Sequence, residues 1–352
     1  MDALAQSLAR SPELFPHSLD VRTDTFGFIG LGRADYRRAS FLDDRILAPH
    51  TLRRTLAWNQ VERAVADAGL KEASHYIFHI GHVGSTLLSR LLGEQPGVMA
   101  LREPAILRTL AQIRGEPAFE RQIWGTDGFE RRLSALLKLW SRTFEPGDRA
   151  VVKTTSFVSE LAGELLDRPS GPRALLMYAS PESYMATILG GANAPQEARR
   201  LAPERLRRLQ GRAGEKVPTP GIGEIVAMSW ACEMTALLAA KTIAGGRALL
   251  LDFDAFLARP AEMLAQAALH LDVPACEQDI AKAIGGPEMR RYSKAPEFAY
   301  DAALRREVQN QARATFGAEI TRGLVWLDQL ARRHPSIKAA LDQRATPEAS
   351  RR

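Results

Sequence analysis

The sequence predicts an α/β protein of the P-loop nucleotide-binding type, with a central parallel sheet flanked by helices. Two observations carry this prediction. Short apolar runs alternate with helical patterns from residue 76 onward, and such alternation is typical of βαβ units with right-handed crossovers. One run leads through a glycine-containing turn, residues 81–86, into a leucine-rich helix. A strand, a turn and a helix in that order form an anion-binding site.

The residues before this alternation, 1–70, are interpreted as an N-terminal elaboration on the main domain, residues 71–335. An extended piece is predicted at Phe26–Leu31 and a helix at Thr51–Ala68, from the spacing of their apolar residues. Their composition does not indicate a role.

Five strands, each apolar enough to be buried on both faces, are predicted in the main domain. They are expected at Tyr76–Ile80, Val98–Leu101, Ala150–Lys153, Ala174–Tyr178 and Ala248–Phe253. Helices are expected at Thr86–Leu92, Ala105–Ile113, Glu130–Phe144, Phe157–Leu166, Glu182–Leu189 and Ile222–Ala244. Residues 192–223, rich in Arg, Pro and Gly, are predicted to form a helical insertion or lid. After two or three more helices, residues 336–352 are expected to be a flexible tail.

The composition of the chain limits the classes of function that it can have. The chain has 352 residues, of which 45% are hydrophobic and 25% charged, as in an ordinary folded domain. A net charge of +6 favours an anionic ligand, whether a nucleotide, a nucleic acid or an acidic membrane. Its two cysteines, Cys232 and Cys276, lack metal-ligand spacing. The N-terminus has no secretory pattern, and the apolar stretch Ile222–Ala244 contains charges, so we expect a cytoplasmic protein without a membrane span.

The turn in YIFHIGHVGSTLLSRLL is the strongest functional signal in the chain. Unpaired N–H groups at a helix start converge on a phosphate, and the helix dipole adds positive potential there. We therefore expect Gly81, Gly84, Ser85, Thr86 and Leu87 to bind the phosphate of a nucleotide. The lysine of the Walker A motif is absent, which disfavours an ordinary ATPase or GTPase.

No metal site is predicted beside this turn. His75, His79 and His82 follow the predicted strand and its end. Because alternate strand residues face opposite ways, His79 and His82 should not converge on one ion.

The turn resembles the 5′-phosphosulfate loop of sulfotransferases. In that family a Lys or Arg, a Ser, a Gly and two Thr or Ser precede a leucine-rich helix, and residues 82–88, HVGSTLL, fall on those places. His82 stands where the family has a permanent cation. With an ordinary pKa near ~6.5, His82 would serve either protonated or as a neutral donor.

Two further segments are similar to the family and imply catalytic residues. MALREPAILR places Glu103 where bacterial and tyrosylprotein sulfotransferases have a general base; alternatively, Glu103 only pairs with Arg102 or another cation. DRAVVKTTSF places Lys153 just past a strand, at the position of a family lysine that neutralises the leaving group. A surface lysine at a strand end is the alternative.

The segment ALLMYASPESYMATIL resembles the part of the family that grips the donor's 3′-phosphate. Ala179 and Thr187 occupy the places of the usual Arg and Ser. Thr187 retains a hydroxyl, whereas Ala179 has no donor, so Ser180 and Ser183 are further hydroxyl candidates.

A late loop, MRRYSKAPEF, is similar in position to the basic segment that closes over the donor. It carries Arg290, Arg291 and Lys294. Such a cluster would supply the cation that Ala179 lacks, although basic loops are commonly only solvated.

The resemblance implies a sulfotransferase that takes 3′-phosphoadenosine-5′-phosphosulfate as donor and an unidentified hydroxyl or amine as acceptor. A kinase or other phosphotransferase is an alternative, because Asp252 and Asp254 lie at a strand end where magnesium could bind. A non-catalytic protein that kept the fold is another. No nucleic-acid partner is expected, since aromatics total 7% and no basic patch is interleaved with them. The acceptor and the oligomeric state are left open.

Overall fold

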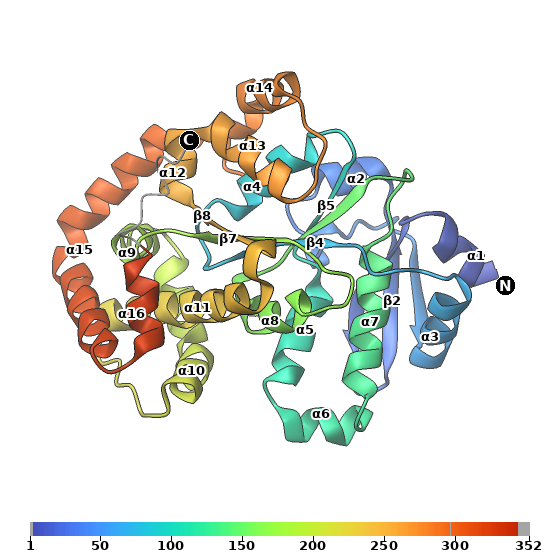
Figure 1. Cartoon of the computed structure of the whole chain (residues 1–352), viewed down its shortest axis with the longest axis horizontal. Helices are drawn as coiled ribbons and strands as arrows, with labels where there is room; N and C mark the ends of the chain where they lie inside the picture. Colours follow the sequence, from blue (N-terminus) through green and yellow to red (C-terminus); the bar gives the residue numbers. More distant parts are fainter. Residues whose placement is uncertain (1–2, 296, 344–352) are drawn as a thin grey trace.

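The computed structural model describes residues 3–295 and 297–343, and its centre is a five-stranded parallel sheet in the order β5-β6-β4-β7-β8 (Figure 1). The strands are β4 (His75–His79), β5 (Val98–Arg102), β6 (Arg149–Lys153), β7 (Ala174–Tyr178) and β8 (Ala248–Asp252). All five lie where apolar runs predicted them, and the predicted α/β class with a central parallel sheet is confirmed. The strand order changes direction at β4, which is where open α/β sheets form their ligand sites.

Helices cover both faces of this sheet, which explains why its strands are apolar on both sides. Helices α4 (Ser85–Gly93) and α13 (Pro260–His270) lie on one face. On the other face lie α8 (Ala162–Leu166) and α11 (Ile222–Ala244) (Figure 1). The other α-helices of the main domain before residue 286 are α5 (Ala105–Arg114), α6 (Pro117–Trp124), α7 (Gly128–Trp140), α9 (Pro181–Leu189), α10 (Ala194–Ala213), α12 (Phe253–Ala258) and α14 (Glu277–Gly285).

Helix α11 begins and ends at the predicted residues. Among the described residues it is the one helix long and apolar enough to cross a membrane, and 78% of that apolar window is buried inside the protein. The helix packs against α10, α8 and the sheet, as a central core helix does.

The residues before β4 form a separate antiparallel sheet of β1 (Leu14–Asp20), β2 (Thr25–Gly30) and β3 (Arg53–Ala57), with helices α1 (Ala3–Arg10), α2 (Arg33–Arg38) and α3 (Trp58–Asp67). The helix predicted from Thr51 is therefore wrong in its first part. Arg53, Arg54 and Thr55 are exposed on an edge strand, so this strand carries no apolar alternation that would distinguish it from a helix.

Buried arginines join this small sheet to the main domain. Nη1 of Arg102, at the end of β5, donates to the carbonyl of Tyr36 at 2.9 Å. Arg142 donates from Nη1 to the carbonyl of Ser11 at 2.9 Å and from Nη2 to that of Leu14 at 2.7 Å. These bonds tie carbonyls of α2, of β1 and of the segment before β1 to the main domain.

The C-terminal part departs from the prediction. Helix α15 (Ala302–Ala331), kinked at Phe316, curves along one side of the molecule and contacts α9, α11 and α16 (Figure 1). The flexible tail expected from residue 336 is wrong up to residue 342, because α16 (Pro335–Asp342) is helical there and buries Ile337 and Leu341. Residues 344–352 lie outside the described residues.

Candidate functional site

The turn between β4 and α4 has a left-handed backbone conformation at two glycines. Gly81 has φ 91°, and Gly84, which precedes α4, has φ 64°. A Cβ placed on Gly84 would lie 2.0 Å from Cε2 of Phe253, so only glycine fits there. No side chain caps the start of α4, and the Oγ1 of Thr86 is buried without a partner. The first amides of the helix are thus free to bind an anion.

His79 fixes the entry to this turn. Its Nε2 lies 2.8 Å from the carbonyl oxygen of Thr154, and the amide of Gly81 donates to its Nδ1 at 3.0 Å. Burial, with the charge of Lys153, lowers its pKa well below the usual value. A neutral imidazole with the proton on Nε2 satisfies both bonds. His79 is therefore a structural residue, and the described residues contain no cluster of three or more His, Cys, Asp or Glu that could hold a metal.

His82 is neutral at physiological pH. Burial lowers its pKa to about 3, and the cations Lys294, Arg205 and Lys153 add to the shift. Of the two states that the sequence allowed, this shift favours the neutral donor in the ligand-free protein. The Nε2 of His82 lies 3.9 Å from an oxygen of Glu197, too far for a hydrogen bond. The turn thus contributes no permanent positive charge of its own.

A cavity of about 460 Å³ lies beside the turn. Its walls come from the turn itself, from the connection between α9 and α10, from α12, from residues 288–294 and from the start of α15. Among the residues selected from the sequence, the structure places these around it: His82, Gly84, Ser85, Thr86, Leu87, Thr187, Arg291 and Lys294. The volume is within the range of nucleotide and cofactor sites.

This cavity combines cations with aromatic rings. Arg291, Lys294 and Arg305 carry the positive charge, while Phe253, Tyr292 and Tyr300 provide the rings. The rings of Tyr292 and Tyr300 lie edge to face, with centroids 5.4 Å apart. Such a lining suits a ligand with a flat base and more than one anionic group.

The loop that carries Arg291 and Lys294 is held to the helix behind the turn by a buried arginine. Nε of Arg90, on α4, donates to the carbonyl of Ser293 at 3.0 Å, and its Nη2 donates to Oγ of Ser40 at 2.7 Å. The N-terminal residues therefore help to hold the basic loop over the site.

Arg305 is the functional candidate that the sequence did not reveal. Its side chain is only 4% exposed. Nη1 of Arg305 lies 3.3 Å from Oγ1 of Thr187, Nη2 lies 3.3 Å from Oγ of Ser183, and Nη2 also pairs with Asp254 at 3.1 Å. Its Nε is buried without a partner. No motif marks this arginine in a long polar helix, and only the packing of α15 on α9 brings it to the site.

Several residues selected from the sequence do not line this cavity: Gly81, Glu103, Lys153, Ser180, Ser183 and Arg290. Ser180 caps α9, where its Oγ accepts from the amide of Ser183 at 3.2 Å, and it lines a neighbouring cleft of about 380 Å³. Nη2 of Arg290 lies 3.3 Å from the carbonyl of Gly285. Ala179 is fully buried, and its carbonyl accepts from Nε1 of Trp230 at 3.0 Å. Ala179 is thus part of the core.

Glu103 and Lys153 form a buried ion pair at the ends of β5 and β6. Lys153 is fully buried and Glu103 is 14% exposed. Burial lowers the pKa of Lys153 to about 8, although the Glu103 carboxylate opposes the shift. Glu103 has φ 55°, and its amide donates to the carbonyl of Lys153 at 2.6 Å. The surface alternative for Lys153 is therefore wrong. Glu103 pairs with a cation, as its alternative allowed, and that cation is Lys153 rather than Arg102.

The two acidic residues on which the kinase alternative rests, Asp252 and Asp254, both bind other groups of the protein. Asp252 accepts from the amides of Asp254 and Ala255 at 2.8 and 3.0 Å, which caps α12. Asp254 pairs with Arg305. Both carboxylates therefore have partners within the protein.

Several solved structures that match this chain are sulfotransferases. The sulfotransferase domain from the curacin biosynthetic pathway matches 70% of this chain and 98% of its own length, with 13% identity and a TM-score of 0.41. A sulfotransferase from Mycobacterium avium matches 89% and 95%, with 14% identity and a TM-score of 0.40. One from Alicyclobacillus acidocaldarius matches 75% and 97%, with 13% identity and a TM-score of 0.37. No protein-family model and no curated protein matches the sequence. Likeness at this level concerns the fold and carries nothing about activity.

Replacing Gly84 with alanine should destabilise the turn. The new Cβ would overlap the Phe253 ring at a left-handed φ, and we expect a loss of roughly 2–4 kcal/mol of unfolding free energy. Chemical denaturation measures it. Gly171→Ala is the matched control, because Gly171 has φ 65° and nothing within 4 Å of its added Cβ. Equal losses in both variants would show that the contact with Phe253 does not constrain the turn.

Proposed function

We propose that the protein is a sulfotransferase that moves a sulfuryl group from 3′-phosphoadenosine-5′-phosphosulfate to a hydroxyl or amine. One observation supports this most: a single cavity joins the free amides of the turn to three cations and three aromatic rings. The ion pair of Glu103 and Lys153 lies at the carboxyl ends of β5 and β6, the same edge of the sheet as the turn. The chain therefore has groups that can bind a nucleotide base, groups that can bind its anionic phosphates and a carboxylate that can accept a proton.

In this proposal the turn binds the 5′-phosphosulfate of the donor. The amides at the start of α4 and the hydroxyls of Ser85 and Thr86 bond its oxygens, with His82 as a neutral donor. Arg291 and Lys294 close over the nucleotide from the basic loop. The rings of Phe253, Tyr292 and Tyr300 are available to the adenine.

Arg305 takes the 3′-phosphate. Arg305 and Thr187 meet at the cavity wall, and a planar guanidinium matches the oxygens of a phosphate in two bonds. The cation that is missing at Ala179 is thus supplied from α15. Its present partner Asp254 is 43% exposed and can turn to solvent when the phosphate arrives.

Transfer requires that the acceptor be deprotonated as the sulfur is attacked. The acceptor oxygen or nitrogen forms a bond to sulfur, the bond from sulfur to the 5′-phosphate oxygen breaks, and the acceptor proton passes to the Glu103 carboxylate. Lys153, released from Glu103 by that protonation, offsets the charge that collects on the leaving phosphate. The products are the sulfated acceptor and adenosine 3′,5′-bisphosphate.

Arg305→Met should remove the preference for a 3′-phosphate. Calorimetry should show that the wild-type protein binds adenosine 3′,5′-bisphosphate more tightly than adenosine 5′-monophosphate. In the variant the bisphosphate should bind about tenfold or more weakly, because a charge-assisted contact is lost, while the monophosphate is little affected.

Arg306→Met is the matched control for this experiment. Arg306 is the exposed neighbour of Arg305 on α15 and lines only the adjoining cleft. If the wild-type protein bound no bisphosphate, the proposed function would be wrong. If it bound but Arg305→Met kept the preference, only the role of Arg305 would be wrong.

Lys153→Met should lower sulfuryl transfer by about 10²–10³-fold, since a charge at the leaving group is removed. Transfer is measured with labelled donor and a panel of hydroxyl and amine acceptors. In the wild-type protein the rate should fall above about pH 8, where Lys153 loses its proton. No step should occur near 6.5, since His82 is already neutral there.

Lys282→Met, at an exposed lysine of α14, controls for the substitution itself. Because Lys153→Met leaves Glu103 without its partner, the double variant with Glu103→Gln restores a neutral pair and protects the fold. Full transfer activity in a folded Lys153→Met protein would contradict the assigned role.

A further inference from the structure

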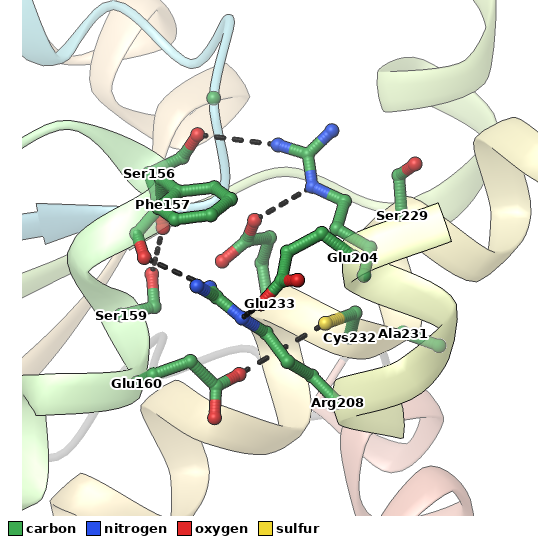
Figure 2. A network of polar contacts seen from close by, with 12 residues as sticks. Ser156, Phe157, Ser159, Glu160, Glu204, Arg208, Ser229, Ala231, Cys232 and Glu233 are labelled. Atoms are coloured by element: carbon green, nitrogen blue, oxygen red, sulfur yellow. Dashed lines mark hydrogen bonds and ion pairs between the residues drawn. The ribbon is translucent and has the colours of Figure 1, made fainter. Parts of the chain in front are cut away.

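Behind the turn lies a buried network that the proposed chemistry does not use. Figure 2 shows it around Ser156, Glu233 and Arg208. Arg205, on α10, is 6% exposed and its Nε donates to Oε1 of Glu233 at 2.8 Å, while Glu233 is only 1% exposed. Nη2 of Arg205 lies 3.3 Å from Oγ of Ser156.

Ser156 connects this arginine to the phosphate turn. It follows β6 at the start of a short 3₁₀ turn, Ser156–Leu161. A Cβ added to Gly81 would lie 3.5 Å from Oγ of Ser156, so the serine lies beside the first glycine of the turn. Ser156 thus stands between Arg205 of α10 and Gly81.

A second, small cavity separates Arg205 from the turn. Its volume is about 30 Å³, and its lining includes Gly81, His82, Ser156, Tyr184 and Arg205. This is the size of one water molecule with several polar neighbours. The guanidinium therefore faces the turn across a space that a single water can bridge.

The charges around His82 distinguish Arg205 from the other cations. Lys294, Arg205, Lys153 and Arg305 all act on His82, and Glu197 lies 3.9 Å from it. Lys294 is on the loop that closes the site, and Lys153 and Arg305 serve other groups of the donor in the proposed reaction. Arg205 is held by Glu233, which is only 1% exposed, whereas the carboxylates that pair with Lys153 and Arg305 are 14% and 43% exposed.

We propose that Arg205 is a positioning residue for the phosphate turn: it holds Ser156 against Gly81 and supplies, from α10, the permanent positive charge that the turn lacks. The inference about Arg205 rests on the proposed function in one respect, because the proposed function assigns the 5′ end of the nucleotide to the turn. Glu233 holds the side chain of Arg205 in place. Lys294, on the loop that closes the site, is not held in this way by any described residue.

The test separates the two ends of the nucleotide. Calorimetry is performed with adenosine 5′-monophosphate and with adenosine 3′-monophosphate. Arg205→Met should weaken the 5′-monophosphate about tenfold and the 3′-monophosphate less than about twofold, because only the 5′-phosphate lies at the turn. Arg305→Met should show the opposite pattern. Arg205→Lys, which keeps the charge, should recover part of the 5′ affinity.

Two further variants keep the test decisive. Arg207→Met is the matched control, since Arg207 is 66% exposed on the same helix. Ser156→Ala leaves the pair of Arg205 and Glu233 intact, and it should weaken the 5′-monophosphate if Arg205→Met does not fold. Equal weakening of both monophosphates in Arg205→Met, or unchanged 5′ affinity in Arg205→Met and Ser156→Ala, would overturn the proposal.

Inorganic pyrophosphate separates this proposal from the proposed function. If the wild-type protein binds pyrophosphate but neither monophosphate, the nucleotide donor is wrong, and the effect of Arg205→Met on pyrophosphate affinity still decides the role of the arginine. We expect that affinity to fall about tenfold. An unchanged affinity would overturn the proposal for Arg205.

Discussion

The geometry of the site depends on the bonds that His79 makes at the end of the central strand. Its imidazole receives the amide of Gly81 and lies against the carbonyl of Thr154, so two neighbouring strand ends and the turn are joined by one side chain. A charged imidazole could not accept the Gly81 amide, and burial keeps it neutral. The close contact between Gly84 and Phe253 then sets where α4 begins. These constraints aim the free amides of the helix into the cavity.

The electrostatics of the site follow from where its charges are buried. The turn itself is neutral, because the pKa of His82 is far below physiological pH. Positive charge reaches the turn from separate elements: Lys153 on β6, Lys294 on the late loop, Arg205 on α10 and Arg305 on α15. Three of these pair with a carboxylate within the protein. Those pairs keep the cations in place before an anion binds, which lowers the cost of organising the site when the ligand arrives.

The sequence predicted the five core strands because each is a short apolar run, and all but the edge strand β8 are largely buried. It predicted the turn because glycine and hydroxyl residues between a strand and a helix have few other uses. It missed β3, since an exposed edge strand needs no apolar alternation. It missed Arg305 and Arg205 for another reason: each is an ordinary arginine in a polar helix, and only tertiary packing brings it to the turn. The pairing of Glu103 with Lys153 likewise depends on two strand ends that are adjacent in space and distant in the chain.

In the proposed function, the amides of the turn bind the anionic end of an adenosine nucleotide. Hydrogen exchange of the backbone amides at residues 82–87, measured with and without adenosine 3′,5′-bisphosphate, tests it most directly. The bisphosphate should slow exchange at these amides, and the effect should be lost when the 5′-phosphate is removed from the ligand. Protection confined to other segments, with unchanged exchange across residues 82–87, would contradict it.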